Sequence, residues 1–321
     1  MKVLVIGASG FIGQPVAQAL SRAGHIVYGL TRSEAKAKQL AAEEVVPIVG
    51  EASNPQSWLN IVPTLDVVIE ALGGSADLRT LSVALVKAVG EAAKASRPAG
   101  SPKISYIYTS GTWVHGESRD EFVCDTTPLL DPVKLVAWRP AVEQAILTDP
   151  TVNGIVIRPA LLYGKTASLL SSLFEEASNG KVSWYGKPGG RFSLIHPDDL
   201  ADIYVRAVEK APIIGGLAID AGNEYTESVE DFLQKLVQVS GAKGPYELVT
   251  PSNSPLTDSQ MVLVFEEALA TSALLRPYLA KSLLGWQQKK PGLVEGLPLY
   301  YAAWQAGKDG KEKSERLFAK A

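Results

Sequence analysis

The sequence predicts an α/β protein in which a doubly wound parallel sheet precedes a smaller C-terminal α/β lobe. Short runs rich in Val and Ile alternate six times within about 160 residues with longer segments of helical period, a pattern typical of βαβ units. A glycine-rich turn directly follows the first of these runs. The length of 321 residues, with 46% hydrophobic and 20% charged residues, allows about two domains with a sizeable core.

Six apolar runs are predicted to be strands buried on both faces, because nearly continuous apolar runs are typical of parallel sheets. They are Val3–Ile6, Ile26–Leu30, Val45–Val49, Val67–Glu70, Lys103–Tyr108 and Ile155–Ile157. The segments between them are predicted to be helices, including Phe11–Ala23, Leu78–Ala95 and Leu135–Leu147. Right-handed crossovers place such helices on both sides of the sheet.

After residue 160 single short strands separate longer helices, which predicts the smaller lobe. The helices expected there are Ser168–Ser178, Pro197–Glu209, Ser228–Gln238 and Asp258–Ala273. Gly186–Gly190 and Pro251–Pro255 are rich in Gly, Pro or Ser and are expected to separate elements. Leu217–Asp220 is strand-like and could return to the first sheet, and Asp309–Ala321 is either an exposed helix or disordered.

Composition argues against several classes of protein. The net charge is −3, from 31 Lys and Arg against 34 Asp and Glu, so a nucleic-acid partner is not expected. A single cysteine excludes an internal disulfide, and no Cys/His cluster has metal-ligand spacing. Neither a secretion signal nor an apolar run of about 18 residues is visible. We therefore expect a cytoplasmic protein with no metal and no membrane partner, existing as a monomer or homodimer.

The glycine turn has the pattern GxxGxxG, with Gly7, Gly10 and Gly13 between the first predicted strand and the first predicted helix. Such a turn suits a dinucleotide: the first glycine permits a tight turn, the second a close approach of the diphosphate, and the third close packing of helix on strand. Free N–H groups at the helix start then bind the phosphates. The residues expected at this cofactor site are Gly7, Ser9, Gly10, Phe11, Ile12 and Gly13. The alternative is a glycine turn without a ligand.

The end of the second predicted strand indicates which dinucleotide binds. An acidic residue there would bind the ribose hydroxyls of NAD, whereas an arginine accommodates the 2′-phosphate of NADP. The segment Tyr28–Ser33 has no carboxylate and contains Arg32, with Lys36 one turn later. We expect NADP(H) as cofactor, unless Arg32 is simply a solvated surface charge.

Further segments are similar to motifs of the extended and atypical short-chain dehydrogenases/reductases, the NAD-dependent epimerase/dehydratase family. Tyr108–Gly116 resembles the family's active-site strand end, Arg158–Gly164 its Arg-Pro segment, and His196–Asp199 its His-Val-Asp-Asp helix start. The resemblance implies an NADP-binding Rossmann domain over residues 1–162. It also implies a substrate-binding lobe over 163–321, with 191–222 partly returning to the first domain. The cofactor contacts it implies beyond the turn fall at Ala71, Leu72, Gly73, Ser110, Arg139, Pro159 and Ala160.

The sequence departs from this family at its Tyr-x-x-x-Lys pair. When the chain is aligned on Glu143, Leu135 occupies the tyrosine position and Arg139 the lysine position. Leucine cannot exchange a proton, and arginine, whose pKa is above about 12, is a poor proton shuttle. No tyrosine lies between Tyr108 and Tyr163 to replace the missing one. Cofactor binding is therefore expected to survive without the family's usual proton chemistry.

Three residues are candidate proton donors to substrate: Thr112, His115 and Tyr163. The family's serine-type partner falls at Gly111, or at Ser110 or Thr112 one step to either side. His115 and Tyr163 also have a structural interpretation, as parts of the active-site loop and the Arg-Pro loop. His196–Asp199 is interpreted as a helix cap, because Pro197 and the two aspartates suit a first helical turn.

The leading hypothesis is an NADP(H)-dependent oxidoreductase acting on a carbonyl, imine or activated C=C bond of a small metabolite. Two alternatives stay open. One is a non-catalytic NADP(H)-binding regulator, which Leu135 favours. The other is a nucleotide-sugar epimerase or dehydratase, which is weakened because such enzymes depend on the tyrosine that Leu135 replaces.

Overall fold

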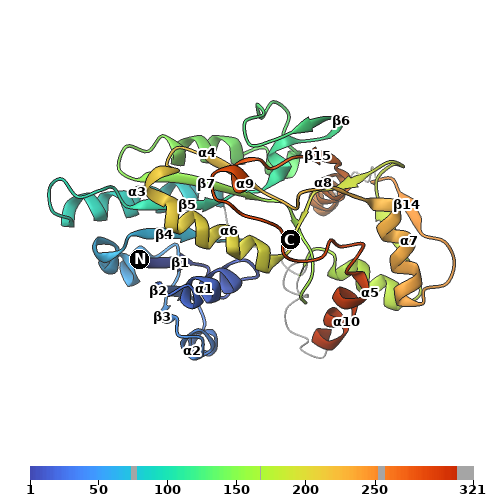
Figure 1. Cartoon of the computed structure of the whole chain (residues 1–321), viewed down its shortest axis with the longest axis horizontal. Helices are drawn as coiled ribbons and strands as arrows, with labels where there is room; N and C mark the ends of the chain where they lie inside the picture. The colour runs from blue at the N-terminus through green and yellow to red at the C-terminus, as the bar shows by residue number, and fades with distance from the viewer. Residues whose placement is uncertain (74–77, 167, 252–256, 309–321) are drawn as a thin grey trace.

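Seven parallel strands form the central sheet of the computed structural model, which describes residues 1–73, 78–166, 168–251 and 257–308 (Figure 1). Their order is β12-β7-β5-β4-β1-β2-β3. The strands are β1 (Lys2–Ile6), β2 (Ile26–Thr31), β3 (Val46–Val49), β4 (Val67–Glu70), β5 (Ser105–Thr109), β7 (Asn153–Pro159) and β12 (Ala218–Ala221). The chain leaves β1 toward β2 and β3 and then crosses to β4 on the other side, so a crevice opens at the carboxyl end of β1. The predicted doubly wound α/β fold is confirmed.

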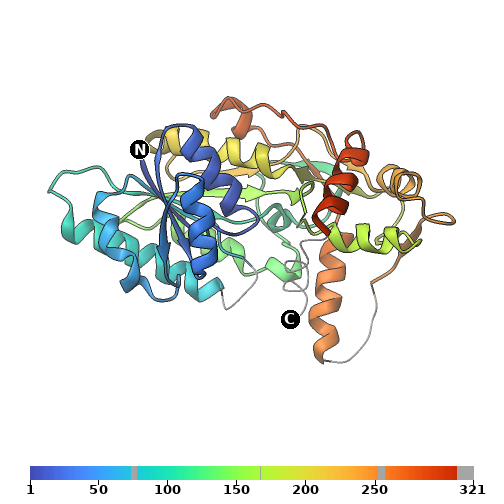
Figure 2. The same ribbon diagram turned by 90° about the horizontal axis from the view of Figure 1, so that it is seen from below.

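Helices cover both faces of this sheet (Figure 2). Val3 and Val5 of β1 face a core shared with α1 (Gly13–Arg22), α2 (Glu34–Ala42) and α6 (Pro197–Lys210). Leu4 and Ile6 face a second core shared with α3 (Leu78–Ser96) and α4 (Arg139–Leu147). Because successive strand residues alternate between faces, one apolar run supplies both cores.

The strand Val45–Val49 was expected to be buried on both faces, and this is wrong. As β3 it lies at the edge of the sheet and pairs only with β2, so Val46 is 46% exposed and Val49 is 41% exposed. Pro47 lacks an N–H group and is tolerated at such an edge.

The helix expected over Leu135–Leu147 begins later, at Arg139. Lys134–Val136 forms a separate 3-10 turn instead. Pro140 explains the break: within a continuous helix its ring would clash with the carbonyl group of Val136, whereas proline is well tolerated in a first helical turn. The four-residue α-helical spacing assumed between Leu135 and Arg139 therefore does not apply.

The second lobe has its own core, formed by four helices and two small sheets. The helices are α5 (Ser171–Ser178), α7 (Val229–Ser240), α8 (Thr257–Ala270) and α10 (Leu297–Lys308). The sheets pair β9 (Ser183–Tyr185) with β14 (Glu247–Val249), and β10 (Arg191–Phe192) with β13 (Glu227–Ser228). The predicted helix Asp258–Ala273 ends at Ala270, because β15 (Ala273–Leu275) pairs with β6 (Ser118–Val123).

The chain returns to the first sheet after entering the second lobe. Strand β12 pairs with β7, as the sequence indicated for Leu217–Asp220, and β8 (Leu161–Leu162) pairs with β11 (Leu194–Ile195). Gly186–Gly190 connects β9 and β10, whereas most of Pro251–Pro255 and all of Asp309–Ala321 lie outside the described residues. The remaining elements are α9 (Leu279–Ser282) and the short 3-10 turns Pro55–Ser57, Leu59–Thr64, Thr112–His115 and Ala211–Ile213. In the part of the chain that the structure describes, no helix is both long and apolar enough to cross a membrane.

Candidate nucleotide site

The glycine turn lies where the sheet's connectivity reverses, between β1 and α1. Gly7 has a φ of +87°, and a Cβ atom there would lie 2.6 Å from the carbonyl oxygen of Ala71 on the neighbouring chain segment. A Cβ atom at Gly13 would lie 2.2 Å from the carbonyl oxygen of Gly7. Both positions therefore require glycine, which allows α1 to begin directly against the strand.

The start of α1 has backbone donors without a partner. Ile12, at the N-cap, makes no side-chain cap bond, while Gly10 donates its N–H to the carbonyl oxygen of Gly7 at 2.9 Å. Among the described residues, none accepts the N–H groups of Phe11 and Ile12. Such free N–H groups at the positive end of a helix suit a diphosphate.

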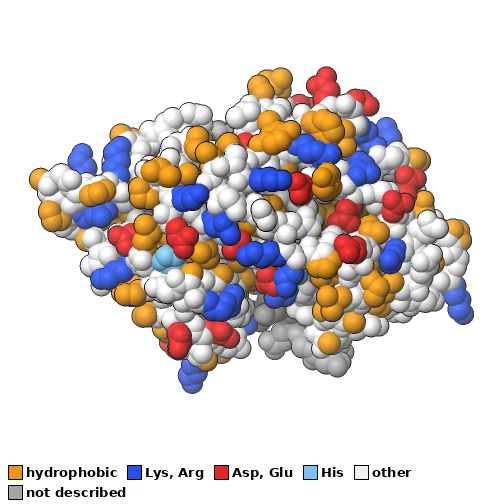
Figure 3. Space-filling view, viewed as in Figure 1, with side chains coloured by type: hydrophobic (Ala, Val, Ile, Leu, Met, Phe, Trp, Pro, Cys, Tyr) orange, Lys and Arg blue, Asp and Glu red, His pale blue; other side chains and the backbone are white. Residues whose placement is uncertain are grey.

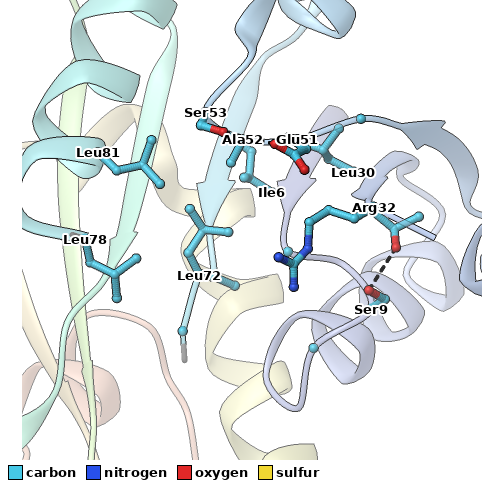
Figure 4. Close-up of a pocket in the computed structure, with 16 residues that line it drawn as sticks. Ile6, Ser9, Leu30, Arg32, Glu51, Ala52, Ser53, Leu72, Leu78 and Leu81 are labelled. Atoms are coloured by element: carbon cyan, nitrogen blue, oxygen red, sulfur yellow. Dashed lines mark hydrogen bonds between the residues drawn. The ribbon is translucent and has the colours of Figure 1, made fainter. Parts of the chain in front are cut away.

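A cavity of about 360 Å³ opens beside this turn, at the carboxyl ends of β1, β2, β3 and β4 (Figure 4). Seven residues expected to contact the cofactor line it: Gly7, Ser9, Gly10, Arg32, Ala71, Leu72 and Gly73. The side chains of Leu72, Leu78 and Leu81 lie across the cavity from Arg32. One apolar wall opposite a charged one suits a flat aromatic base beside a phosphate.

Arg32 extends from the end of β2 into this cavity (Figure 4). Within the described ranges its guanidinium has no hydrogen bond and no ion pair. The neighbouring Thr31 hydroxyl is held 3.0 Å from the Ser9 hydroxyl, which ties the end of β2 to the glycine turn. Lys36, the second predicted cation, donates to Gln39 on the surface and does not line the cavity.

The sequence reasoning missed the wall after β3. Gly50, Glu51, Ala52 and Ser53 line the cavity, together with Leu78 and Leu81 from the start of α3. A signal for the first four was present, since they follow a predicted strand and ligands of such folds bind at the carboxyl ends of strands. Of the described residues that line this cavity, Glu51 alone is acidic, and its carboxylate accepts a hydrogen bond from Ser53 at 3.4 Å.

The other predicted cofactor contacts gather at the carboxyl ends of β5 and β7. Pro159 ends β7 and Ala160 follows it, while Ser110 follows β5 and donates its N–H to the carbonyl oxygen of Ile157. Arg139 reaches the same edge from α4, donating to the carbonyl oxygen of Thr109 at 3.1 Å. The structure therefore places these residues at the carboxyl ends of β5 and β7, which lie two and three strands away from β1 and its glycine turn.

The three candidate proton donors lie in different environments. Thr112 lines a small cavity of about 30 Å³ with Trp113, Phe192 and Ala268. The His115 side chain is completely buried, with its Nε2 atom 2.9 Å from the Asp220 carboxylate. Tyr163 is also completely buried, and its hydroxyl donates to the carbonyl oxygen of Pro291 at 2.8 Å. Burial raises the pKa of Tyr163 far above its usual value, so this phenol keeps its proton.

A buried ionic network lies behind the ends of β5, β7 and β12. Arg158 binds the Glu143 carboxylate with both Nε and Nη2, at 3.1 and 2.7 Å from its Oε2 atom. The Ser110 hydroxyl donates to the same carboxylate at 2.5 Å. Asp220 lies 3.6 Å from Arg158 and bonds to His115, so two acids share one arginine and one histidine. The network fixes the position of Ser110 at the predicted cofactor edge.

His196 caps α6 as expected, whereas Asp199 binds a distant segment of the chain instead of the helix start. The His196 Nδ1 atom accepts the N–H of Asp198 at 3.1 Å, and the Asp199 carboxylate accepts the N–H groups of Lys289 and Lys290. These bonds tie the start of α6 to the C-terminal segment. Across the described residues, no group of three or more His, Cys, Asp or Glu side chains could hold a metal ion.

Comparison with known proteins agrees with this geometry. Residues 7–162 match the model of a family described as NAD(P)H-binding. The 2-alkyl-3-oxoalkanoate reductase of Stenotrophomonas maltophilia is 25% identical over 254 residues, which are 75% of this chain and 76% of that protein.

Two solved structures show the same fold over almost the whole chain. The UDP-glucuronic acid 4-epimerase from Bacillus cereus, in complex with NAD, has a TM-score of 0.70 at 19% identity, covering 95% of this chain and 99% of that one. The human epimerase family protein SDR39U1, with NADPH, has a TM-score of 0.69 at 17% identity, covering 94% and 99%.

The fold and the glycine turn define a Rossmann-type protein that binds an NAD(P) dinucleotide. Residues 7–162 of the chain thus match a family model described as NAD(P)H-binding, and almost the whole chain shares the fold of these two solved structures.

Proposed function

We propose that the protein is an NADP(H)-dependent oxidoreductase that reduces a carbonyl, imine or activated C=C bond of a small metabolite. The observation that carries the proposal is Arg32, a cation without a partner among the described residues, which lies in the nucleotide cavity. A planar guanidinium pairs well with a phosphate group, and the 2′-phosphate distinguishes NADP from NAD. Strand β2 ends in Thr31 and carries no carboxylate that would repel this phosphate.

Different residues of this chain would bind different parts of the cofactor. The N–H groups of Phe11 and Ile12 would bind the diphosphate, and Arg32 the 2′-phosphate. Arg139 would face the nicotinamide ribose from the end of β5. The bound nicotinamide supplies a hydride at its C4 atom, so the protein has to orient the substrate and stabilise the charge that develops on it.

Among the three candidate donors, the surroundings of Thr112 favour it for contact with substrate. Thr112 lines a cavity between the end of β5 and the second lobe, whereas the Nε2 atom of His115 and the hydroxyl of Tyr163 already have hydrogen-bond partners. A threonine hydroxyl does not ionise near neutral pH, but it can donate a hydrogen bond to a developing oxyanion. The proton then comes from solvent through this hydroxyl.

A reductase activity is further supported by one relative. The Stenotrophomonas maltophilia protein is named as a reductase of 2-alkyl-3-oxoalkanoates, which carry a ketone. By analogy we favour a carbonyl group in this substrate.

A second candidate function is a non-catalytic NADP(H)-responsive regulator. The small cavity beside Thr112 favours it, because about 30 Å³ has room for little more than a water molecule. Leu135, at the expected tyrosine position, points in the same direction. In this case the nucleotide would change the affinity for a partner without being consumed.

The experiment that separates the two is a turnover assay with a library of small carbonyl compounds, following NADPH at saturating concentration. The oxidoreductase is expected to consume NADPH with at least one compound, and Thr112→Val is expected to slow that reaction without weakening nucleotide binding. Saturable NADPH binding with no turnover by any compound would overturn the proposal. A pull-down that changes with NADPH would then support the regulator.

A further inference from the structure

A second cavity of about 360 Å³ lies at the opposite edge of the sheet from the nucleotide site. Its walls come from the end of α3, from the connection between α3 and β5, and from Pro150 and Thr151 just before β7. It therefore opens at the amino ends of β5 and β7, whereas the nucleotide cavity opens at carboxyl ends. No function described above uses it.

The charged residues around this cavity are all cations: Lys94, Arg97 and Lys103. None of its lining residues is acidic. The carboxylate nearest in sequence to these lining residues is that of Asp149. One of its oxygens, Oδ1, accepts hydrogen bonds from both the N–H and the hydroxyl of Thr151. Figure 3 shows Lys and Arg side chains at the left end of the molecule, where α3 ends in Figure 1.

Arg97, which lines the cavity, carries a hydrogen-bond donor that is unpaired among the described residues. Its Nη1 atom is shielded from solvent and, in the part of the chain that the structure describes, has no hydrogen-bond partner. A buried donor without an acceptor is costly, and more so when it carries charge. An acceptor inside the cavity would remove this cost.

The helix dipole does not account for all three cations. Lys94 lies in the last turn of α3 and suits the negative end of that helix. Arg97 and Lys103 lie beyond the helix, on the connection that leads into β5. Within the described ranges these three cations form no ion pair. Their summed charge exceeds that of one carboxylate, whereas a phosphate carries close to two negative charges at neutral pH.

We propose that this cavity binds the phosphate group of a small metabolite at a site distinct from the nucleotide site. Arg97 would donate to the phosphate oxygens with its planar fork, and Lys94 and Lys103 would add point charges from either side. Helix α3 connects the two cavities. Its first turns line the nucleotide cavity with Leu78 and Leu81, and its last turn lines the second cavity with Ala93 and Lys94.

The test is a titration of the isotope-labelled full chain with inorganic phosphate at constant ionic strength, followed through the backbone amide resonances. Saturable shifts are expected for residues 94–104. Arg97→Gln and Lys103→Gln are each expected to weaken this binding at least tenfold, since each removes a charge-assisted contact. Lys87→Gln is the matched control, because Lys87 lies exposed on α3 outside the cavity.

Four results would overturn the proposal: no saturable shift at residues 94–104, unchanged affinity in Arg97→Gln, an equal loss in Lys87→Gln, or equally tight binding of malonate, which would assign a dicarboxylate instead. If Arg97→Gln does not fold, Lys103→Gln decides on its own. Phosphate that binds instead at the glycine turn is recognised by shifts around residues 7–13, which the three variants leave unchanged.

Discussion

The guanidinium of Arg139 donates a hydrogen bond of 3.0 Å to the phenol oxygen of Tyr108. The alignment on Glu143 predicts that this arginine takes the place of the family's lysine, and the tyrosine it contacts lies on β5. Burial raises the pKa of Tyr108 to about 12, even though the positive charge of Arg139 acts to lower it. The phenol therefore stays protonated at neutral pH and serves to hold Arg139 at the end of β5.

If Tyr108 acts only by positioning Arg139, the two should be coupled in nucleotide binding. Arg139→Met is expected to weaken NADPH binding at least tenfold, because a charge-assisted contact to the ribose is lost. Tyr108→Phe should weaken it by a smaller factor, and the double variant should bind no worse than Arg139→Met alone. Isothermal titration calorimetry measures all four proteins. Additive losses would show that Tyr108 has a separate role.

The choice of cofactor depends on Arg32. Arg32→Asp should weaken NADPH binding at least tenfold, since a charge-assisted pair contributes about 1.5–3 kcal/mol. NADH binding should be unchanged or tighter, because the new carboxylate can accept from the ribose hydroxyls.

Lys38→Asp provides the matched control for this change, because Lys38 is exposed on α2 and does not line the cavity. Calorimetric titration with both nucleotides gives the ratio of affinities. Equal affinity of the wild type and Arg32→Asp for NADPH would discard the assignment of NADP(H).

The glycine turn tolerates no side chain at its third position. A Cβ atom at Gly13 would lie 2.2 Å from the carbonyl oxygen of Gly7, so Gly13→Ala must push α1 away from β1. We expect a loss of about 2 kcal/mol or more in the free energy of unfolding and loss of measurable nucleotide binding. Gly73→Ala is the control for stability alone, since among the described residues nothing lies within 4 Å of a Cβ atom there. Urea denaturation that gives both variants the same stability would contradict this view of the turn.

The part of the fold that sequence predicts well rests on local patterns. The apolar run Val67–Glu70 and the helical pattern of Phe11–Ala23 each reflect burial within one element, and β4 and α1 match them closely. Gly7 and Gly13 were recognised because their pattern lies within seven residues of chain, although the contact that excludes a side chain at Gly7 is with the distant Ala71.

Contacts between distant parts of the chain could not be read in the same way. The His115 side chain bonds to Asp220 across 105 positions, and their partnership depends on β12 joining the sheet beside β7. The buried position of Tyr163 depends likewise on Pro291, 128 positions later. Such residues look like free catalytic groups in the sequence because their partners arrive only with the tertiary fold.

Removing one partner of the buried Arg158–Glu143 ion pair is expected to destabilise the protein more than removing both. Glu143→Leu should lower the free energy of unfolding by about 3–5 kcal/mol, because the buried guanidinium of Arg158 then loses its hydrogen-bonded carboxylate. Adding Arg158→Met should restore part of this loss, since the second charge is then also removed. The exposed pair of Lys134 and Glu267, 3.0 Å apart, is the comparison: Glu267→Gln should cost less than about 1 kcal/mol. Urea denaturation that shows equal costs for the two single variants would contradict the importance of burial.

His196 should make the fold sensitive to mild acid. Burial lowers the pKa of His196 from 6.5 to about 4, and its Nδ1 atom needs a free lone pair to accept the N–H of Asp198 at the start of α6. A folded-state pKa below the unfolded value means that the stabilisation is complete above pH 6.5 and is lost as the pH falls toward 4.

The variant His196→Asn tests this directly, because asparagine can accept the same bond and does not titrate in this range. It should be less stable than the wild type at pH 7, since the imidazole packs against the rings of Tyr163 and Tyr300. Its free energy of unfolding should nevertheless fall less between pH 7 and pH 4.5, by on the order of 1–2 kcal/mol after allowance for solvent screening. Acids that do not contact His196 titrate equally in both proteins and cancel in the difference, whereas Asp198, 3.8 Å from the imidazole, loses this interaction in the variant. Parallel pH profiles from urea denaturation would mean that His196 is not the source of the acid sensitivity.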